Sequence, residues 1–408
     1  MNDICIFDPV KEINEVRNQI SVSKRMGFFF GAGTSMALGM PGIESLTEQV
    51  MNNIEIEYRE QIKKIILDLK KEDMAKKITI EDILNHIRLI RQITREHHER
   101  CYRDIDGCNA KNLDSQICNK IYEILSYKEN EITDGQNKLK ITQKFFAWLN
   151  LLGRDHAKEV FTANYDLLFE KALEILQLPY FDGFIGAYEP FFVAESIEKG
   201  GDLREYPPFS WIRIWKVHGS LGWFWKSNPK SSGYRVIRLG KQAKNDTLNE
   251  LVIYPSREKY ESSRKQPFTA YLDRMKHHIS EGEGIFIISG YSFADDHIND
   301  IIFNGLRHNN RLHIMAFLFR DDELHNIKDH VKCNLNMSVF SPTEAIIGGN
   351  HGKWHAVSTD NATELTSYWN IDKGELLLGD FIKLVNFLVD TSGRKKIIER
   401  ELEVKNEK

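Results

Sequence analysis

The sequence is poor in cysteine, and its cysteines lack the spacing of a metal site or a disulfide framework. Five of them are scattered along the 408 residues without a Cys-x-x-Cys pair: Cys5, Cys101, Cys108, Cys118 and Cys333. A zinc ribbon needs paired cysteines, and a disulfide framework needs an even set. We therefore expect reduced thiols and no zinc ribbon. Histidine-rich stretches such as "REHHER" and "HGKWH" lack a supporting carboxylate or cysteine at ligand spacing, so no metal site is expected either.

Long hydrophobic runs are also absent. The longest apolar stretches, such as "GIFIISG" and "HIMAFLF", are much shorter than the roughly 20 residues of a membrane-spanning helix. The N-terminal "MNDICIFDPVKEINE" has no basic region followed by an apolar run, as a secretory signal would. The sequence thus predicts a cytoplasmic protein without membrane contact.

Neither sign of charge is in large excess. The chain has 55 Lys and Arg against 59 Asp and Glu, which gives a formal net charge of −4 at pH 7. This balance provides no overall attraction to nucleic acid, so direct nucleic-acid binding is not indicated. The length exceeds the usual roughly 100–200 residues of one domain, and we expect one large core with a second lobe.

Short apolar runs that end in polar or glycine-bearing turns are present at four places. They are Phe28–Phe30 before "GAGTS", Glu159–Phe161 before "TANYD", Trp211–Val217 before "HGSLGW" and Gly284–Ile288 before "SGYSFADDHIND". A helix is expected at His297–Leu306 and a fifth strand at Leu312–Phe319. This alternation predicts an α/β protein with a parallel sheet, whose ligands bind beyond the carboxyl ends of the strands.

A helical region separates the first two of these strands. Thr79 and Asp82 form a plausible helix cap, and Ile80, Ile83, Leu84, Ile87 and Ile90 follow at helical spacing. We interpret residues 44–150 as a helical lobe inserted into a domain of residues 1–340, with 103–118 as a loop. The remaining residues 341–408 form a C-terminal extension, in which "GGNHGKWH" resembles an irregular loop, "LLLGDFIKLVNFLV" a buried helix and "GRKKIIERELEVKNEK" a solvated helix or a frayed end.

The glycine-rich "GAGTS" turn has few side chains, so a ligand could lie against its backbone. A helix that follows would direct its first N–H groups and its dipole at that ligand, which favours phosphate. The turn is not a Walker loop, because no Gly-Lys-Ser/Thr follows, and Met36 replaces the third glycine of the dinucleotide-binding fingerprint. The alternative is a tight strand-to-helix turn that binds nothing.

Two further turns carry polar side chains. Asn164 and Asp166 in "TANYD" could orient a ribose hydroxyl, a water or a carboxamide, or they could cap the next helix. His218 in "VHGS" could act as a general base, because imidazole titrates near neutrality, or it could be a hydrogen-bonded core residue among tryptophans.

In this order, "GAGTS…GMP", "TANYD", "VHGS" and "SGYSF" resemble the sirtuin (silent-information-regulator-two) family over about residues 27–320. The resemblance implies a Rossmann-like NAD-binding domain with His218 as catalytic base and with Asn164 and Asp166 at the nicotinamide ribose and carboxamide. It also implies that the following residues bind NAD: Gly31, Ala32, Gly33, Thr34 and Ser35 at the diphosphate, and Ser289 and Gly290 at the adenosine half.

The chain departs from the deacylase sirtuins in two places. It has Pro41-Gly42-Ile43-Glu44 where they have Pro-Asp-Phe-Arg, and it lacks their four-cysteine zinc ribbon. In these respects, and in "TANYD" and "GYSFADDHIND", it is similar to the sirtuin-like NADases of bacterial anti-phage defence. The resemblance thus implies an NAD hydrolase that takes NAD as substrate without a metal, in a homo-oligomer that works with a HerA-type hexameric ATPase. A protein-lysine deacylase and a non-catalytic NAD sensor are the alternatives.

Overall fold

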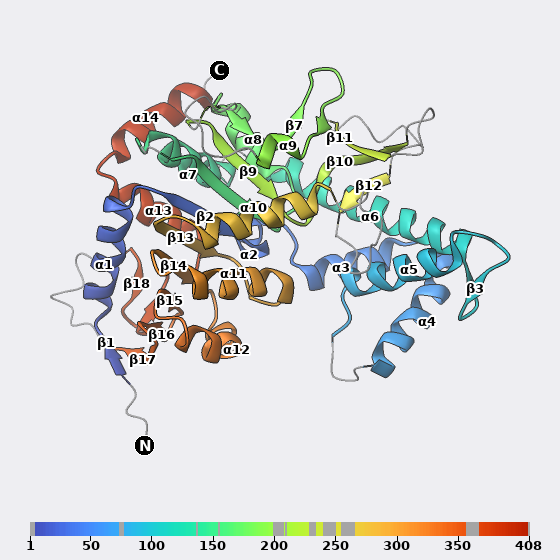
Figure 1. Cartoon of the computed structure of the whole chain (residues 1–408), viewed down its shortest axis with the longest axis horizontal. Helices are drawn as coiled ribbons and strands as arrows, with labels where there is room; N and C mark the ends of the chain where they lie inside the picture. The colour runs from blue at the N-terminus through green and yellow to red at the C-terminus, as the bar shows by residue number, and fades with distance from the viewer. Residues whose placement is uncertain are drawn as a thin grey trace.

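A mixed sheet forms the centre of the molecule (Figure 1). The computed structural model describes residues 5–72, 77–135, 138–153, 156–198, 208, 210–227, 234–239, 250–253, 266–355 and 367–406. Within this part of the chain, the sheet contains parallel strands in the spatial order β15 (Met337–Phe340), β14 (Leu312–Phe317), β13 (Gly284–Ser289), β2 (Met26–Phe30), β5 (Lys158–Thr162), β9 (Ile212–Lys216) and β6 (Tyr180–Phe181). The expected α/β class with a Rossmann-like parallel sheet is confirmed, and the five predicted strands are all present.

Strand β2 lies where the order of the sheet reverses. The chain passes from β2 to β5 and β9 on one side, and later returns to place β13, β14 and β15 on the other side. In open parallel sheets, the crevice between strands that lead in opposite directions is the usual place of a ligand. The turns that follow β2 and β13 therefore meet at this position.

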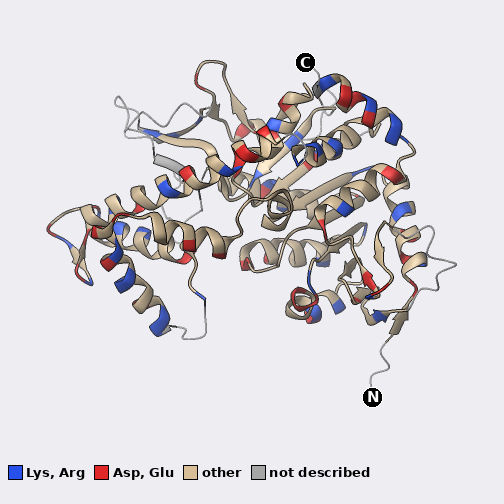
Figure 2. Cartoon of the chain, turned by 180° about the vertical axis from the view of Figure 1, so that it is seen from behind, with Lys and Arg blue, Asp and Glu red and all other residues tan. Residues whose placement is uncertain are grey.

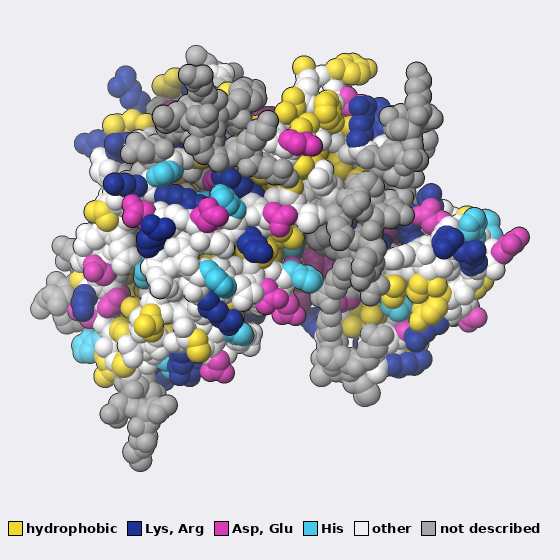
Figure 3. Space-filling model, in the orientation of Figure 1, with side chains coloured by type: hydrophobic (Ala, Val, Ile, Leu, Met, Phe, Trp, Pro, Cys, Tyr) yellow, Lys and Arg dark blue, Asp and Glu magenta, His cyan; other side chains and the backbone are white. Residues whose placement is uncertain are grey.

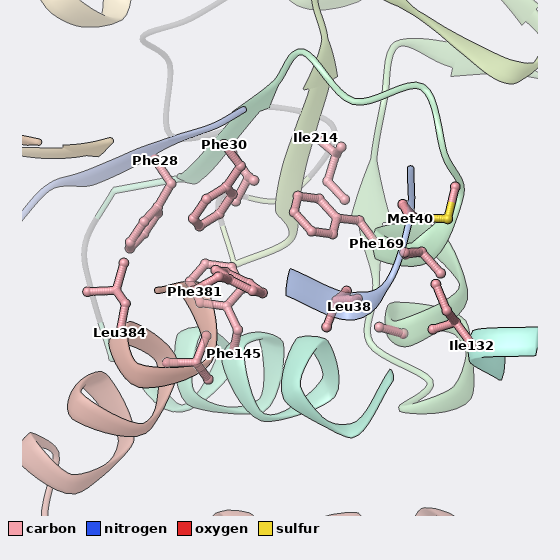
Figure 4. Close-up of a cluster of buried hydrophobic side chains, with 14 of the residues drawn as sticks. Phe28, Phe30, Leu38, Met40, Ile132, Phe145, Phe169, Ile214, Phe381 and Leu384 are labelled. Atoms are coloured by element: carbon pink, nitrogen blue, oxygen red, sulfur yellow. The ribbon is translucent and has the colours of Figure 1, made fainter. Parts of the chain in front are cut away.

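The phenylalanines of β2 anchor both faces of the sheet. Phe28 and Phe30 point to one face, where the centroid of each ring lies 5.1 Å from that of Phe145 (Figure 4). The ring centroids of Phe30 and Phe381 are 5.5 Å apart. Phe29 points to the other face and contacts Tyr291, because side chains alternate along a strand. The first face is covered by α1 (Pro9–Val22), α7 (Leu139–Leu151), α8 (Leu168–Ile175), α13 (Phe381–Thr391) and α14 (Lys395–Asn406), and the second by α10 (Phe268–Ser280), α11 (Asp296–His308) and α12 (Asp321–Lys332).

Helices α3 (Ile43–Asn53), α4 (Ile56–Glu72), α5 (Ile80–Thr94) and α6 (Gly107–Asp134) extend to one side of the sheet (Figure 1). The expected capping box of Thr79 and Asp82 begins α5, and the isoleucine stripe of α5 is buried. The loop expected at 103–118 is wrong beyond its first residues: a short hairpin of β3 (Cys101–Tyr102) and β4 (Ile105–Asp106) leads directly into α6. Asp106 begins that helix, since its side chain accepts a hydrogen bond from the Asn109 N–H.

Helix α7 belongs to the layer over the sheet, because it contacts α8, α13 and α14 and packs Phe145 and Trp148 against Phe28. A second, antiparallel sheet lies beside α6 and contains β12 (Glu250–Ile253), β10 (Gly219–Ser227), β11 (Tyr234–Arg238), β8 (Phe191–Phe192) and β7 (Phe184–Ile185). The short helix α2 (Ala32–Leu38) follows β2 and contacts α13, and the short helix α9 (Glu195–Glu198) contacts α10.

Residues after 340 pack into the same core. The irregular loop expected at "GGNHGKWH" is wrong, because β17 (Asn350–Trp354) pairs with β16 (Glu344–Ile347) and with β1 (Cys5–Phe7) at the edge of the sheet. The small hairpin of β18 (Trp369–Asn370) and β19 (Glu375–Leu376) precedes α13, the expected buried helix. Helix α14 confirms the expected mixed-charge helix at the end of the sequence (Figure 2).

Basic and acidic side chains are interspersed on the face shown in Figure 3. None of the described helices is both long enough and apolar enough to cross a membrane.

Candidate active site

The turns after β2 and β13 pack backbone against backbone. The Gly31 N–H donates to Ser289 O at 3.0 Å, and the Gly33 N–H donates to Gly290 O at 2.8 Å. A Cβ atom on Gly31 would lie 2.4 Å from Gly290 O, and Gly290 itself has a φ of +66°. The glycines are therefore required by the packing of the two turns, whereas the sequence argument explained them by the approach of a ligand.

Part of the donor capacity of the glycine-rich turn is used within the protein. The Gly33 N–H is bonded to Gly290, and the Thr34 N–H donates to Gly31 O at 3.1 Å. The Thr34 hydroxyl also donates to Gly31 O, at 2.8 Å. An anion at this turn would depend on the other N–H groups at the start of α2.

Four polar side chains from two turns form one buried network. The Asn164 amide donates from Nδ2 to Thr34 Oγ1 at 3.0 Å and to Ser35 Oγ at 2.8 Å. The Ser35 hydroxyl in turn donates to Asp166 Oδ2 at 2.6 Å. All four side chains are buried, so the network connects the turn after β2 to the turn after β5. The structure thus brings these predicted site residues into direct contact.

Two buried polar atoms at this place have no hydrogen-bond partner among the described residues: Asn164 Oδ1 and Ser289 Oγ. A buried polar group without a partner costs free energy, and such groups are rare in folded proteins. Both atoms belong to residues that the sequence assigned to NAD. A ligand that carries hydroxyl groups, as a ribose does, could satisfy them, and in this respect the residues present fit a nucleotide.

The helix-capping alternative applies to Asp166 and not to Asn164. Asp166 Oδ1 accepts a hydrogen bond from the N–H of Leu168, the first residue of α8, at 3.2 Å. The side chain of Asn164 bonds to the glycine-rich turn instead. A carboxylate has more acceptor positions than the two bonds to Asp166 occupy, so Asp166 can still accept from a ligand.

His218 lies two residues after the end of β9 and forms a pair with Asp295, the residue that caps α11. His218 Nε2 lies 3.0 Å from Asp295 Oδ2, and Asp295 Oδ1 accepts from the backbone N–H groups of His297 and Ile298. Burial acts to raise the pKa of Asp295, but the hydrogen bond and charge of His218 and the two N–H groups outweigh it and lower that pKa to about 2. The ionised carboxylate can only accept, so Nε2 carries a proton, and in the neutral imidazole Nδ1 is then the acceptor nitrogen.

Helix α5 contributes a second carboxylate near His218. Glu81 on α5 accepts a hydrogen bond from the Tyr165 hydroxyl at 2.9 Å, and Tyr165 lies between Asn164 and Asp166. Burial raises the pKa of Glu81, and the charge of His218 partly offsets this effect. Glu81 thus bonds to the turn that carries Asn164 and lies close enough to His218 for their charges to interact.

Sequence reasoning did not identify Glu81, Lys216 or the contact of Asp295 with His218. Lys216 had a signal, because it is a cation inside the otherwise apolar run "IRIWKVH". A cavity of about 390 Å³ lies elsewhere and is lined by residues such as Tyr180, Asp182 and Arg238. No cluster of three or more potential metal ligands is found among the described residues.

A comparison with curated proteins gives no match for this chain. A family model described as SIR2-like domain matches residues 158–338, which are less than half of the chain. The match contains the turns of Asn164, His218 and Ser289, while the glycine-rich turn at 31–35 lies outside it. Residues 158–338 are therefore similar to a SIR2-like domain; such domains are NAD-dependent enzymes, and the match fits an activity related to NAD.

Proposed function

We propose that the protein hydrolyses NAD at the bond between nicotinamide and ribose. The observation that carries this proposal is the buried carbonyl Oδ1 of Asn164, which has no partner among the described residues, while the amide nitrogen of the same side chain donates to the turn after β2. An amide held in this way suits the binding of a ribose, and a histidine whose neutral form has its acceptor at Nδ1 suits the activation of a water. The SIR2-like match supports NAD as the molecule concerned.

The dinucleotide would lie across the turns after β2 and β13. Gly31, Ala32, Gly33, Thr34 and Ser35 would hold the diphosphate, and Ser289 and Gly290 the adenosine half. Binding energy from these distant parts of NAD would fix the position of the reacting ribose carbon, which lowers the entropic part of the barrier.

The bond breaks when nicotinamide leaves as a neutral base, with the electrons of the C–N bond, and the ribose becomes an oxocarbenium ion. Asp166 would orient the carboxamide of nicotinamide, and Asn164 a ribose hydroxyl or the attacking water. That water would add to the ribose carbon while His218 Nδ1 takes its proton. The charge of Asp295 would stabilise the imidazolium that forms.

The resemblance of the motifs extends the proposal to the biological role. We propose that depletion of NAD serves anti-phage defence by abortive infection, and that the chain acts as a homo-oligomer with a HerA-type hexameric ATPase. An unregulated NADase would deplete the NAD of its own cell, so activity must be gated. The absence of a zinc ribbon in the sequence favours hydrolysis over deacylation, because the ribbon borders the peptide groove of the deacylases.

Incubation of the purified chain with NAD, alone and with a HerA-type ATPase, tests the proposal through the release of nicotinamide. We expect release from the native protein and none from Asn164→Ala or His218→Ala, with the fold intact in both variants. His308→Ala, a change at an exposed histidine, serves as the control and should keep full activity. Full activity in either site variant would refute the assignment, and nicotinamide release that requires an acetylated peptide would show a deacylase instead.

A further inference from the structure

Lys216 is a buried lysine whose ammonium group contacts the turn of Asn164 and Asp166. It is the last residue of β9, and its side chain is only 3% exposed. Its Nζ donates to Asn164 O at 3.2 Å and also to Asp166 O, and it forms an ion pair with Glu170 Oε1 at 3.2 Å. The three N–H groups of the ammonium thus have three acceptors, two of which belong to the proposed site.

The backbone carbonyls of Asn164 and Asp166 both point at the Lys216 ammonium, and this fixes the backbone conformation of the turn between them. Asn164 and Asp166 are two residues apart, and the hydroxyl of the residue between them, Tyr165, donates a hydrogen bond to Glu81. When the carbonyls of 164 and 166 face Lys216, the side chains of these residues contact Thr34 and Ser35. Lys216 also precedes His218 by two residues, so one strand end places both the turn and the histidine.

We propose that Lys216 is a positioning residue of this site, whose ammonium holds the backbone of residues 164–166 so that Asn164 and Asp166 face the ligand. The inference rests on the proposed function, because it assigns the effect to NAD cleavage. Lys216 does not touch the reacting atoms. It acts through the two carbonyls, and its loss would leave them without their donor in a buried place.

Glu170 on α8 is the third partner of this ammonium. Burial raises the pKa of Glu170 to about 7, although the charge of Lys216 acts to lower it. An ammonium buried beside a carboxylate and two carbonyls has its desolvation offset, whereas removal of one partner leaves the others buried and unsatisfied. Glu170 therefore stabilises the buried ammonium of Lys216.

Lys158 offers a matched comparison. It is also a buried strand lysine, 6% exposed, and its Nζ donates to one backbone carbonyl, Asn150 O, at 2.9 Å. It is the first residue of β5, so it lies at the other end of the strand from the turn of Asn164. A lysine that only supports the fold should behave like Lys158, and a positioning lysine should not.

The experiment compares Lys216→Met, Lys216→Arg and Lys158→Met in the full chain. Nicotinamide release from NAD is measured at several NAD concentrations, and hydrogen–deuterium exchange is measured on the peptide that contains residues 162–170. We expect Lys216→Met to lower kcat at least 10-fold with KM within 3-fold, and to speed exchange in this peptide. Lys216→Arg, which keeps the charge, should recover part of kcat, and Lys158→Met should change neither kcat nor this exchange.

Native kcat and native exchange in Lys216→Met would overturn the inference, as would an equal loss of kcat in Lys158→Met. If Lys216→Met does not fold, Lys216→Arg decides: kcat reduced with faster exchange at 162–170 supports the inference, and native values overturn it. If the native protein releases no nicotinamide, the proposed function fails, and exchange alone tests whether Lys216 holds the turn.

Discussion

The buried carboxylate of Glu159 provides a quantitative test of what holds the sheet together. Glu159 lies in β5, and its side chain is 3% exposed. Arg274 of α10 donates to both of its oxygens, from Nε to Oε2 at 3.0 Å and from Nη2 to Oε1. The Trp215 indole N–H also donates to Oε2, at 2.9 Å, and Arg213 lies 3.8 Å from Oε1. We expect Glu159→Gln to destabilise the fold, because it removes from a buried place the carboxylate charge that Arg274 and Arg213 face.

The pKa of Glu159 and the usual cost of breaking a buried ion pair give similar values for the expected loss of stability. Burial acts to raise the pKa of Glu159, but Arg274, His278 and Arg213 outweigh it and lower that pKa from 4.5 to about 2. That difference corresponds to about 3 kcal/mol of stability at neutral pH. Removal of one partner from a buried ion pair typically costs about 3–5 kcal/mol. We therefore expect Glu159→Gln to lower the free energy of unfolding by about 3 kcal/mol at pH 7.

The dependence on pH has a definite sign. The pKa in the folded state lies below that in the unfolded chain, so the contribution of Glu159 is complete above about pH 4.5 and is lost as the pH falls toward 2. Urea unfolding of the native protein and of Glu159→Gln should thus differ most at pH 7, and the difference should shrink below pH 4.5. Glu60→Gln, a change in an exposed pair with Lys63, is the control and should leave the free energy of unfolding nearly unchanged. A loss below about 1 kcal/mol at pH 7, or a loss that does not depend on pH, would refute this reasoning.

Two further variants test the site itself. Asp295→Asn keeps an acceptor for His218 and a helix cap but removes the charge. We expect kcat for nicotinamide release to fall about 10-fold to 100-fold, because a hydrogen bond to a charged group contributes about 1.5–3 kcal/mol. An unchanged kcat would contradict the role of the pair. Gly290→Ala places a Cβ 2.4 Å from the Thr34 N, whereas the equivalent atom on Gly348, which also has a positive φ, meets nothing within 4 Å. Thermal unfolding should therefore show a clearly larger loss for Gly290→Ala than for Gly348→Ala, and equal losses would mean that the contact between the two turns is loose.

The five strands β2, β5, β9, β13 and β14 were predictable because their signal is local. Each is a short apolar run bounded by a turn, and β2 and β13 differ from the prediction by at most two residues at either end. The capping box of Thr79 and Asp82 was equally visible, since both partners lie within one helical turn.

The two wrong loops show where local patterns fail. Residues 107–118 contain glycine and asparagine, which favour turns, yet Ala110, Leu113 and Ile117 are buried against α5 and hold the segment as a helix. Residues 350–354 have little apolar character, and only their pairing with β16 and β1 makes them a strand. In both cases, partners distant in sequence decided the conformation.

By itself, the sequence determined the α/β class, the polar turns at the strand ends and the residue types of the site, because each depends on neighbours within a few positions. Only the tertiary structure decided that β13 lies beside β2, that Asp295 contacts His218 and that Lys216 holds the turn of Asn164 and Asp166. These contacts join residues that are 50 or more positions apart. Their geometry depends on the order of the strands and on the burial of charge, and no short stretch of sequence carries either.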